Sequence, residues 1–184
     1  MEDSKIIELF YARSEEAIQE LSKKYGSVCG KIARNILNNN LDAEECVNDA
    51  YLGAWNTIPP QNPKPLQTYI YRLVRNLSIT KYHANTAAKR NSYYDVALDE
   101  LEECLSSRIT VESELAGKEL SQLLDCFLDT LDQENRVMFV RRYWYSDSVA
   151  DIAARLGMKP NHVSVRLSRI RGRLKKYLQK EDVL

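Results

Sequence analysis

The sequence predicts an all-α protein built from two small helical domains joined by an acidic linker. Apolar residues recur at steps of three and four positions, and alternation of apolar and polar residues is nowhere sustained. Glycine is scarce, with 6 among 184 residues. A polar and then acidic stretch with weak periodicity separates two periodic halves, and the length suits two small domains. We therefore place the domains at residues 1–94 and 113–184 and the linker at residues 95–112.

Four helices are expected in the first domain. They cover about Lys5–Tyr25, Val28–Leu37, Asp42–Trp55 and Leu66–Ala84. Gly26 is expected to stop the first helix, and the run Asn38-Asn39-Asn40 suits the end of the second. Asp42 can cap the third helix, with Glu45 three residues later completing a capping box. The prolines that follow Ile58 are expected to end this helix.

The second domain contains two short helical patterns with the spacing of a helix-turn-helix. Apolar residues of Val149–Leu156 share one face, and Gly157 follows as a C-cap glycine does. Pro160 suits the first turn of the next helix. Ala153 is small enough to let the two helices cross closely, and Val163 can lock the second helix in place. The apolar stripe of this second helix is Val163, Leu167, Ile170 and Leu174.

Charge is strongly segregated along a chain whose formal net charge is zero. Residues 95–134 hold 12 acidic and two basic side chains, a net charge of −10. Residues 135–180 hold 12 basic and two acidic side chains, a net charge of +10. Residues 50–94 contain no acid at all. Blocks of one sign favour polyanionic partners over an ordinary solvated surface.

Four arginines concentrate this charge on the second helix of the helix-turn-helix: Arg166, Arg169, Arg171 and Arg173. With the apolar stripe buried, the opposite face is free to enter a major groove, where arginine reads guanine edges or holds phosphates. The alternative is a solvated basic helix in a small bundle. The expected free face is Asn161, His162, Ser164, Val165, Arg166, Ser168, Arg169 and Arg173.

The third and fourth helices carry two further candidate faces. On the fourth, Tyr71, Arg75, Ser78 and Tyr82 line up, with Asn76 beside them. Aromatic, basic and amide side chains together suit single-stranded DNA, through stacking and phosphate contacts; exposed tyrosines on a bundle helix are the plainer alternative. On the third helix, one face mixes acidic, polar and apolar groups. It suits a basic protein surface rather than DNA, unless it is merely solvated. Its members are Glu45, Asn48, Asp49 and Leu52.

Three segments in this order resemble the extracytoplasmic-function (ECF) sigma factors of bacterial RNA polymerase. The first, LDAEECVNDAYLGAWN, resembles the helix of region 2 that binds core polymerase. The second, TYIYRLVRNLSITKYH, is similar to the adjoining promoter-melting helix. The third, which begins LDQENRVMFVRRYWYS and runs to residue 178, resembles region 4. The resemblance covers nearly the whole chain.

The resemblance implies three contact surfaces. The clamp of the large polymerase subunit would meet Glu45, Asn48, Asp49 and Leu52. The melted minus-10 element would meet Tyr71, Arg75, Asn76, Lys81, Tyr82 and Asn85, with the loop that follows to residue 90. The minus-35 element would meet Asn161, His162, Ser164, Arg166, Arg169 and Arg173. The acidic linker would thread toward the active-centre cleft of the polymerase. An inhibitory anti-sigma factor, often anchored in a membrane, is also implied.

Other classes fit poorly. The sequence has no phosphate-binding glycine loop and no nucleophile elbow, so we expect no enzyme and no small-molecule substrate. Four isolated cysteines and two separated histidines predict no metal site or cofactor, and reduced thiols that are buried or partly buried. No apolar run approaches the ~20 residues that span a bilayer, and the acidic N-terminus is unlike a secretory signal. We therefore expect a cytoplasmic protein.

One alternative function remains open. A helix-turn-helix regulator that binds duplex DNA without core polymerase explains residues 135–180 equally well. It gives no purpose to the acidic face of the third helix or to the aromatic and basic face of the fourth.

Overall fold

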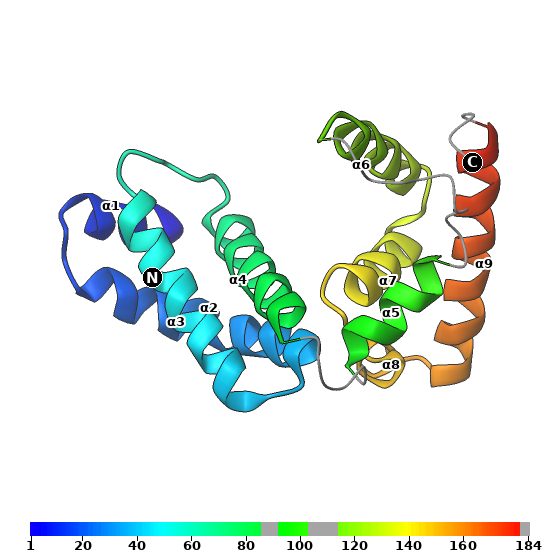
Figure 1. Cartoon of the computed structure of the whole chain (residues 1–184), viewed down its shortest axis with the longest axis horizontal. Helices are drawn as coiled ribbons and strands as arrows, with labels where there is room; N and C mark the ends of the chain where they lie inside the picture. The colour runs from blue at the N-terminus through cyan, green and yellow to red at the C-terminus, as the bar shows by residue number, and fades with distance from the viewer. Residues whose placement is uncertain (86–91, 103–113, 181–184) are drawn as a thin grey trace. The chain divides into compact units, whose positions relative to one another are not determined.

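The structure is a computed structural model that describes residues 1–85, 92–102 and 114–180. Every regular element within these ranges is an α-helix, so the predicted all-α class is confirmed. The chain divides into two compact units, Met1–Ser92 and Tyr93–Leu184 (Figure 1). Among the described residues, no helix combines the length and the apolar character needed to cross a lipid bilayer.

The first unit is a bundle of four helices, three of which pack around the fourth. Its elements are α1 (Asp3–Tyr11), α2 (Glu16–Leu37), α3 (Asn40–Thr57) and α4 (Leu66–Ala84). Helix α2 packs against each of the other three. Each of these three helices contributes buried side chains to the core, for example Phe10 from α1, Ala50 from α3 and Ile70 from α4. The four helices therefore share one core. Its largest fully buried side chains include Ile6, Phe10, Leu21, Ile32, Ile36, Leu66 and Ile70.

The prediction that Gly26 ends the first helix is wrong. The chain breaks earlier, between α1 and α2, where Arg13 has a φ of 53°. Gly26 instead lies inside α2, facing α3. A Cβ atom there would lie 3.2 Å from the hydroxyl of Tyr51. This glycine therefore serves close packing of two helices rather than termination.

The three consecutive asparagines lie where α2 ends and α3 begins. Asn38 takes a left-handed conformation with φ of 50°, which asparagine tolerates better than most residues. The side chain of Asn39 then caps α3 by accepting a hydrogen bond from the backbone N–H of Leu41 at 2.9 Å. Helix α3 thus begins at Asn40. The prediction that Asp42 is its N-cap is wrong. The predicted bounds of α4 are confirmed.

The second unit contains the predicted helix-turn-helix. Its helices are α5 (Tyr93–Glu102), α6 (Glu114–Asp129), α7 (Gln133–Tyr143), α8 (Val149–Leu156) and α9 (Pro160–Lys180). Gly157 ends α8 with φ of 65° and donates its backbone N–H to the carbonyl oxygen of Ala153. The expected apolar stripe of α9 is buried against α7 and α8. The core of this unit includes Phe127, Met138, Ile152, Val163, Leu167, Ile170 and Leu174.

Part of the expected linker belongs to the second unit. Helix α5 packs on α7, and Ala97 lies in the core with Leu101 packed against it. The apolar stripe of α5 is only two turns long, too short to stand out against its acidic residues. The remainder of the expected linker, residues 103–112, lies outside the described ranges.

The cysteines are separate from one another in the described part of the chain. Cys29 and Cys46 are buried and free. Burial raises the pKa of Cys29 to about 12. Cys126 is exposed, which corrects the expectation of buried or partly buried thiols. Cys104 lies outside the described residues.

Candidate nucleic-acid interface

The predicted protein-binding face lies on the open side of α3. The small residues Ala43, Ala50 and Ala54 turn inward, which leaves the opposite side of the helix in solvent. Leu52 is 57% exposed, so this side of α3 carries a large apolar side chain. The four predicted residues are all exposed: Glu45, Asn48, Asp49 and Leu52.

Residues that the sequence reasoning missed extend this face. A groove of about 420 Å³ adjoins Leu52 and is lined by Ile18 of α2 and Trp55 of α3. Leu41, at the start of α3, is 77% exposed. Ile18 joins the surface only through the packing of α2 on α3, so no local pattern could have revealed it. The exposed leucines follow the helical spacing of the predicted face, so Leu41 could have been found by extending that stripe one turn.

Lys81 of α4 lies between the two predicted faces of the first unit. Its ammonium nitrogen is 2.5 Å from a carboxylate oxygen of Glu45 and 3.4 Å from one of Asp42. The hydrogen bond with Glu45 raises the pKa of Lys81. Asn85 donates from its side-chain amide to Asp42 at 3.2 Å. Two candidates for minus-10 DNA are therefore held beside the acidic face of α3.

The predicted DNA face of α4 is only partly available. Tyr71 is 3% exposed and packs edge-on against Tyr25 of α2, so its assignment as a DNA contact is wrong in this structure. Ser78 is fully buried. The face turns inward because Tyr71 and Ser78 follow the same side of the helix toward α2 and α3. The remaining candidates on α4 are exposed or partly exposed: Arg75, Asn76, Lys81 and Tyr82.

The outer side of α9 presents polar side chains, as predicted. Asn161, His162, Ser164, Arg169 and Arg173 are exposed. Val165 is exposed among them. Arg169 has no partner among the described residues. The exposed side chains begin at the first turn of α9, directly after the turn of the helix-turn-helix, which is where a recognition helix approaches base edges.

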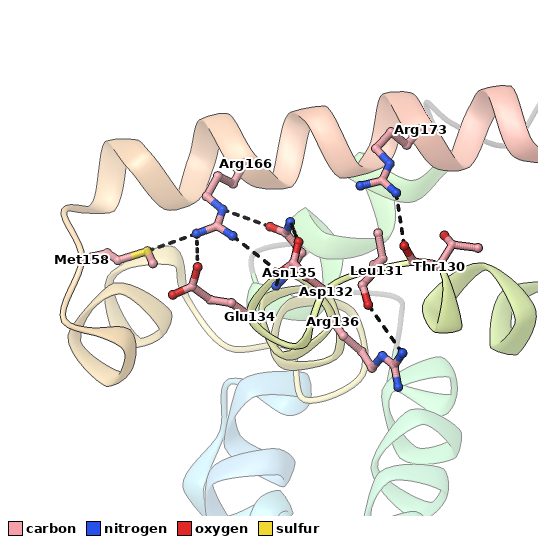
Figure 2. A network of polar contacts seen from close by, with 9 residues as sticks. All are labelled: Thr130, Leu131, Asp132, Glu134, Asn135, Arg136, Met158, Arg166 and Arg173. Carbon is pink, nitrogen blue, oxygen red and sulfur yellow. Dashed lines mark hydrogen bonds and ion pairs between the residues drawn. The ribbon is translucent and has the colours of Figure 1, made fainter.

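Arg166 differs from Arg169 because its guanidinium turns toward α7 (Figure 2). Its Nε donates to the side-chain oxygen of Asn135 at 3.0 Å. Its Nη1 forms an ion pair with Glu134, and its Nη2 lies 3.9 Å from a carboxylate oxygen of Asp132. The side chain is 28% exposed. The structure therefore places a predicted base-reading arginine against three polar side chains of its own chain.

Two other arginines of the cluster also contact the protein. Arg173 donates to the backbone oxygen of Thr130 at 3.4 Å, although its side chain is exposed (Figure 2). Arg171 points to the opposite side of α9, where Nη1 donates to Tyr143 at 2.9 Å and to Glu100 at 3.2 Å. Thus only part of the positive charge counted on α9 faces outward.

Glu100 of α5 is the centre of a second polar cluster. Both its carboxylate oxygens accept from Arg142, at 2.8 and 3.2 Å, and one also accepts from Tyr143 at 3.0 Å. Burial alone would raise the pKa of Glu100, but hydrogen bonds and the charge of Arg142 outweigh it and lower the pKa. Glu100 thereby neutralises the buried Arg142 and fixes α5 to α7.

Two family models match parts of the chain. A family model described as Sigma-70 region 2 matches residues 21–87, which span α2 to α4. A model described as Sigma-70, region 4, matches residues 121–174, which include the helix-turn-helix. A solved structure described as CnrH in complex with the cytosolic domain of CnrY is 20% identical, with a TM-score of 0.44 over 97% of each chain. No curated protein matches the sequence.

The two family matches lie in the order expected from the sequence, and each falls within one compact unit. Proteins with these regions act by binding DNA, not by catalysing a reaction. The chain therefore belongs to the sigma-70 family and is a sigma factor, a protein that directs transcription.

Proposed function

We propose that this sigma factor is of the ECF type and binds core polymerase through α3, melted minus-10 DNA through α4 and the minus-35 element through α9. The observation that carries the proposal lies within the first unit. An acidic face with an exposed leucine on α3 adjoins a basic and aromatic face on α4. A regulator that binds duplex DNA alone has no use for such a pair of faces.

The proposed core-binding surface combines charge with apolar area. Glu45 and Asp49 suit a basic helix of the polymerase clamp. Leu52, Leu41 and the groove beside Trp55 supply apolar area at the same surface. Interfaces are stabilised most by apolar and aromatic groups buried at their centre. We therefore assign the anchoring contact to Leu52 and the orientation of the partner to the two acids.

The proposed minus-10 surface uses the side chains of α4 that remain accessible. Tyr82 is half-buried beside His83, with ring centroids 5.5 Å apart. An aromatic ring in that position can stack on an unpaired base, and Arg75 and Lys81 lie near it in sequence for phosphate contacts. Asn76 is exposed and can donate to or accept from a base edge. Buried Tyr71 takes no part in this surface.

The proposed minus-35 surface is the first half of α9. Asn161, His162 and Ser164 occupy the turn that would enter the major groove, and Arg169 follows about one turn later. By the resemblance to ECF sigma factors, an anti-sigma factor would cover one or more of these surfaces when transcription is not required. Its cytoplasmic part would compete with core polymerase for the chain.

Transcription with purified core polymerase and a randomised promoter library tests the proposal. We expect starts that depend on core polymerase and select sequences in both promoter elements, with no other sigma factor present. Replacing Glu45 and Asp49 together with lysine should abolish core binding, whereas Glu44→Lys serves as a nearby control. Tight binding of duplex DNA by the free chain, with no association with core, would instead establish the simple regulator.

A further inference from the structure

Arg166 lies in the middle of the proposed minus-35 helix, but its guanidinium is held by the protein. We propose that Arg166 is a positioning residue that fixes α9 against the start of α7, and that the exposed side chains around Arg169 read the bases. This inference rests on the proposed role of α9 in minus-35 recognition.

The contacts of Arg166 use every nitrogen of its guanidinium (Figure 2). Nε donates to Asn135 at 3.0 Å and Nη1 pairs with Glu134. Nη2 faces Asp132 at 3.9 Å, and Nη1 also lies 3.9 Å from the sulfur of Met158. Reading guanine in bidentate fashion requires two N–H groups directed at the base. In this arrangement the donors point to α7 and to the turn before α9.

The acceptors around Arg166 are also held by hydrogen bonds to one another. The carboxylate of Asp132 caps α7 by accepting from the backbone N–H of Asn135 at 2.9 Å. The side-chain amide nitrogen of Asn135 donates to the other oxygen of Asp132 at 2.5 Å, which leaves its oxygen directed at Arg166. The backbone hydrogen bond from Asn135 also lowers the pKa of Asp132, so the group stays ionised. Acids at a helix N-terminus are stabilised by the helix dipole.

Three parts of the helix-turn-helix region meet at Arg166. Glu134 and Asn135 belong to α7, Met158 belongs to the turn after α8, and Arg166 itself belongs to α9. A change at Arg166 would therefore shift the first half of the recognition helix relative to α7 and the turn, although the buried stripe still holds α9 in the core. Such a shift affects contacts with all bases of the element together. Loss of a base-reading side chain, by contrast, relaxes selectivity at one position.

Selection from a minus-35 library by the holoenzyme separates these two roles. For Arg166→Gln we expect weaker use of every minus-35 sequence with an unchanged order of preference. For Arg169→Ala we expect a loss of selectivity at one position, by about 5- to 150-fold. Relaxed selectivity at a single position in Arg166→Gln would overturn the inference. If Arg169→Ala and alanine variants at Asn161 and His162 all left the preferences unchanged, the proposed role of α9 would fail instead.

A double-mutant cycle tests the contact itself. If Arg166 acts through α7, Glu134→Gln weakens minus-35 use, and the double variant with Arg166→Gln loses less than the two single losses combined. Independent effects, or a gain of promoter use in Glu134→Gln, would contradict the inference. Should Arg166→Gln fail to fold, Arg166→Lys retains the charge beside Glu134. We expect it to recover part of the promoter use with the same base preferences.

The salt dependence of holoenzyme binding to the promoter provides a second measurement. A phosphate contact contributes about one unit to the slope of log affinity against log salt. Arg166→Gln should leave this slope unchanged, because the arginine is already neutralised by the protein. A slope reduced by about one would identify Arg166 as a phosphate contact and overturn the inference.

Discussion

The ammonium group of Lys81 lies 2.5 Å from the carboxylate of Glu45, which joins a candidate contact for minus-10 DNA to a candidate contact for core polymerase. The pair connects α4 with α3 at the surface, and Glu45 remains largely exposed. Core polymerase and Lys81 would thus compete for the same carboxylate. If the proposed contacts are right, core polymerase that pairs with Glu45 would release Lys81 for minus-10 DNA.

Glu45→Gln separates the stabilising role of this pair from its binding role. Exposed ion pairs contribute about 0–1 kcal/mol, so we expect the free energy of unfolding, measured in urea, to change by less than about 1 kcal/mol. Affinity for core polymerase should fall, because a partner cation loses its counter-charge. Glu44→Gln, a neighbouring change outside the proposed face, is the control. Equal loss of core affinity in both variants would count against the assignment of Glu45.

Tyr71 and Tyr82 should respond in opposite ways to truncation. Tyr71→Ala empties a core position and should lower the free energy of unfolding by about 3–5 kcal/mol. Tyr82→Ala should affect stability little and should weaken binding of a single-stranded minus-10 oligonucleotide to the holoenzyme by about 1–3 kcal/mol. Chemical denaturation and oligonucleotide titration measure the two effects. A stable Tyr71→Ala protein with weakened oligonucleotide binding would reverse the assignments.

The Glu100 cluster predicts loss of stability in acid. The pKa of Glu100 is lowered in the folded protein from its ordinary value of 4.5. Its contribution is therefore complete above pH 4.5 and is lost as the pH falls through the lower folded value. Glu100→Gln should remove this part of the pH dependence and cost up to about 3 kcal/mol at neutral pH, because buried Arg142 loses its counter-charge. Thermal unfolding from pH 3 to 7 measures both effects, with exposed Asp99→Asn as the control.

Two glycines of the second unit should respond with opposite signs to alanine. Gly157 has φ of 65°, so Gly157→Ala should destabilise by about 1–2 kcal/mol through the backbone alone, since a Cβ atom meets nothing within 4 Å. Gly172 lies inside α9 with equally open space around it. Gly172→Ala should stabilise by about 1 kcal/mol. Urea denaturation of both variants gives the signs, and the same sign in both would contradict the backbone explanation.

Local signals predicted several elements well. The bounds of α4 were predicted correctly, and Gly157 with Pro160 correctly predicted the turn of the helix-turn-helix. These features act through the backbone within a few residues, so they can be read without knowing the fold. The prediction that Gly26 ends a helix was wrong because the role of this glycine depends on Tyr51, 25 positions later in the chain.

The candidate surfaces were harder to predict, because a helix face is defined by what packs against it. Exposed Glu45, Asn48 and Leu52 were placed by helical spacing alone. Tyr71 has the right spacing for the DNA face of α4, but Tyr25 covers it. The net charge of the second unit predicted a positively charged surface on α9 but not which arginines form it. Arg166 and Arg171 are instead paired with Glu134 and Glu100.

Arg166 and Arg171 form ion pairs with Glu134 and Glu100 on opposite sides of α9. The outward side chains of this helix make few contacts with the rest of the described protein. Mutation can consequently alter the outward positions without disturbing the folding of the unit. If α9 reads the minus-35 element as proposed, duplicated copies of such a gene would be able to acquire new promoter preferences in single steps while each copy remains a stable protein.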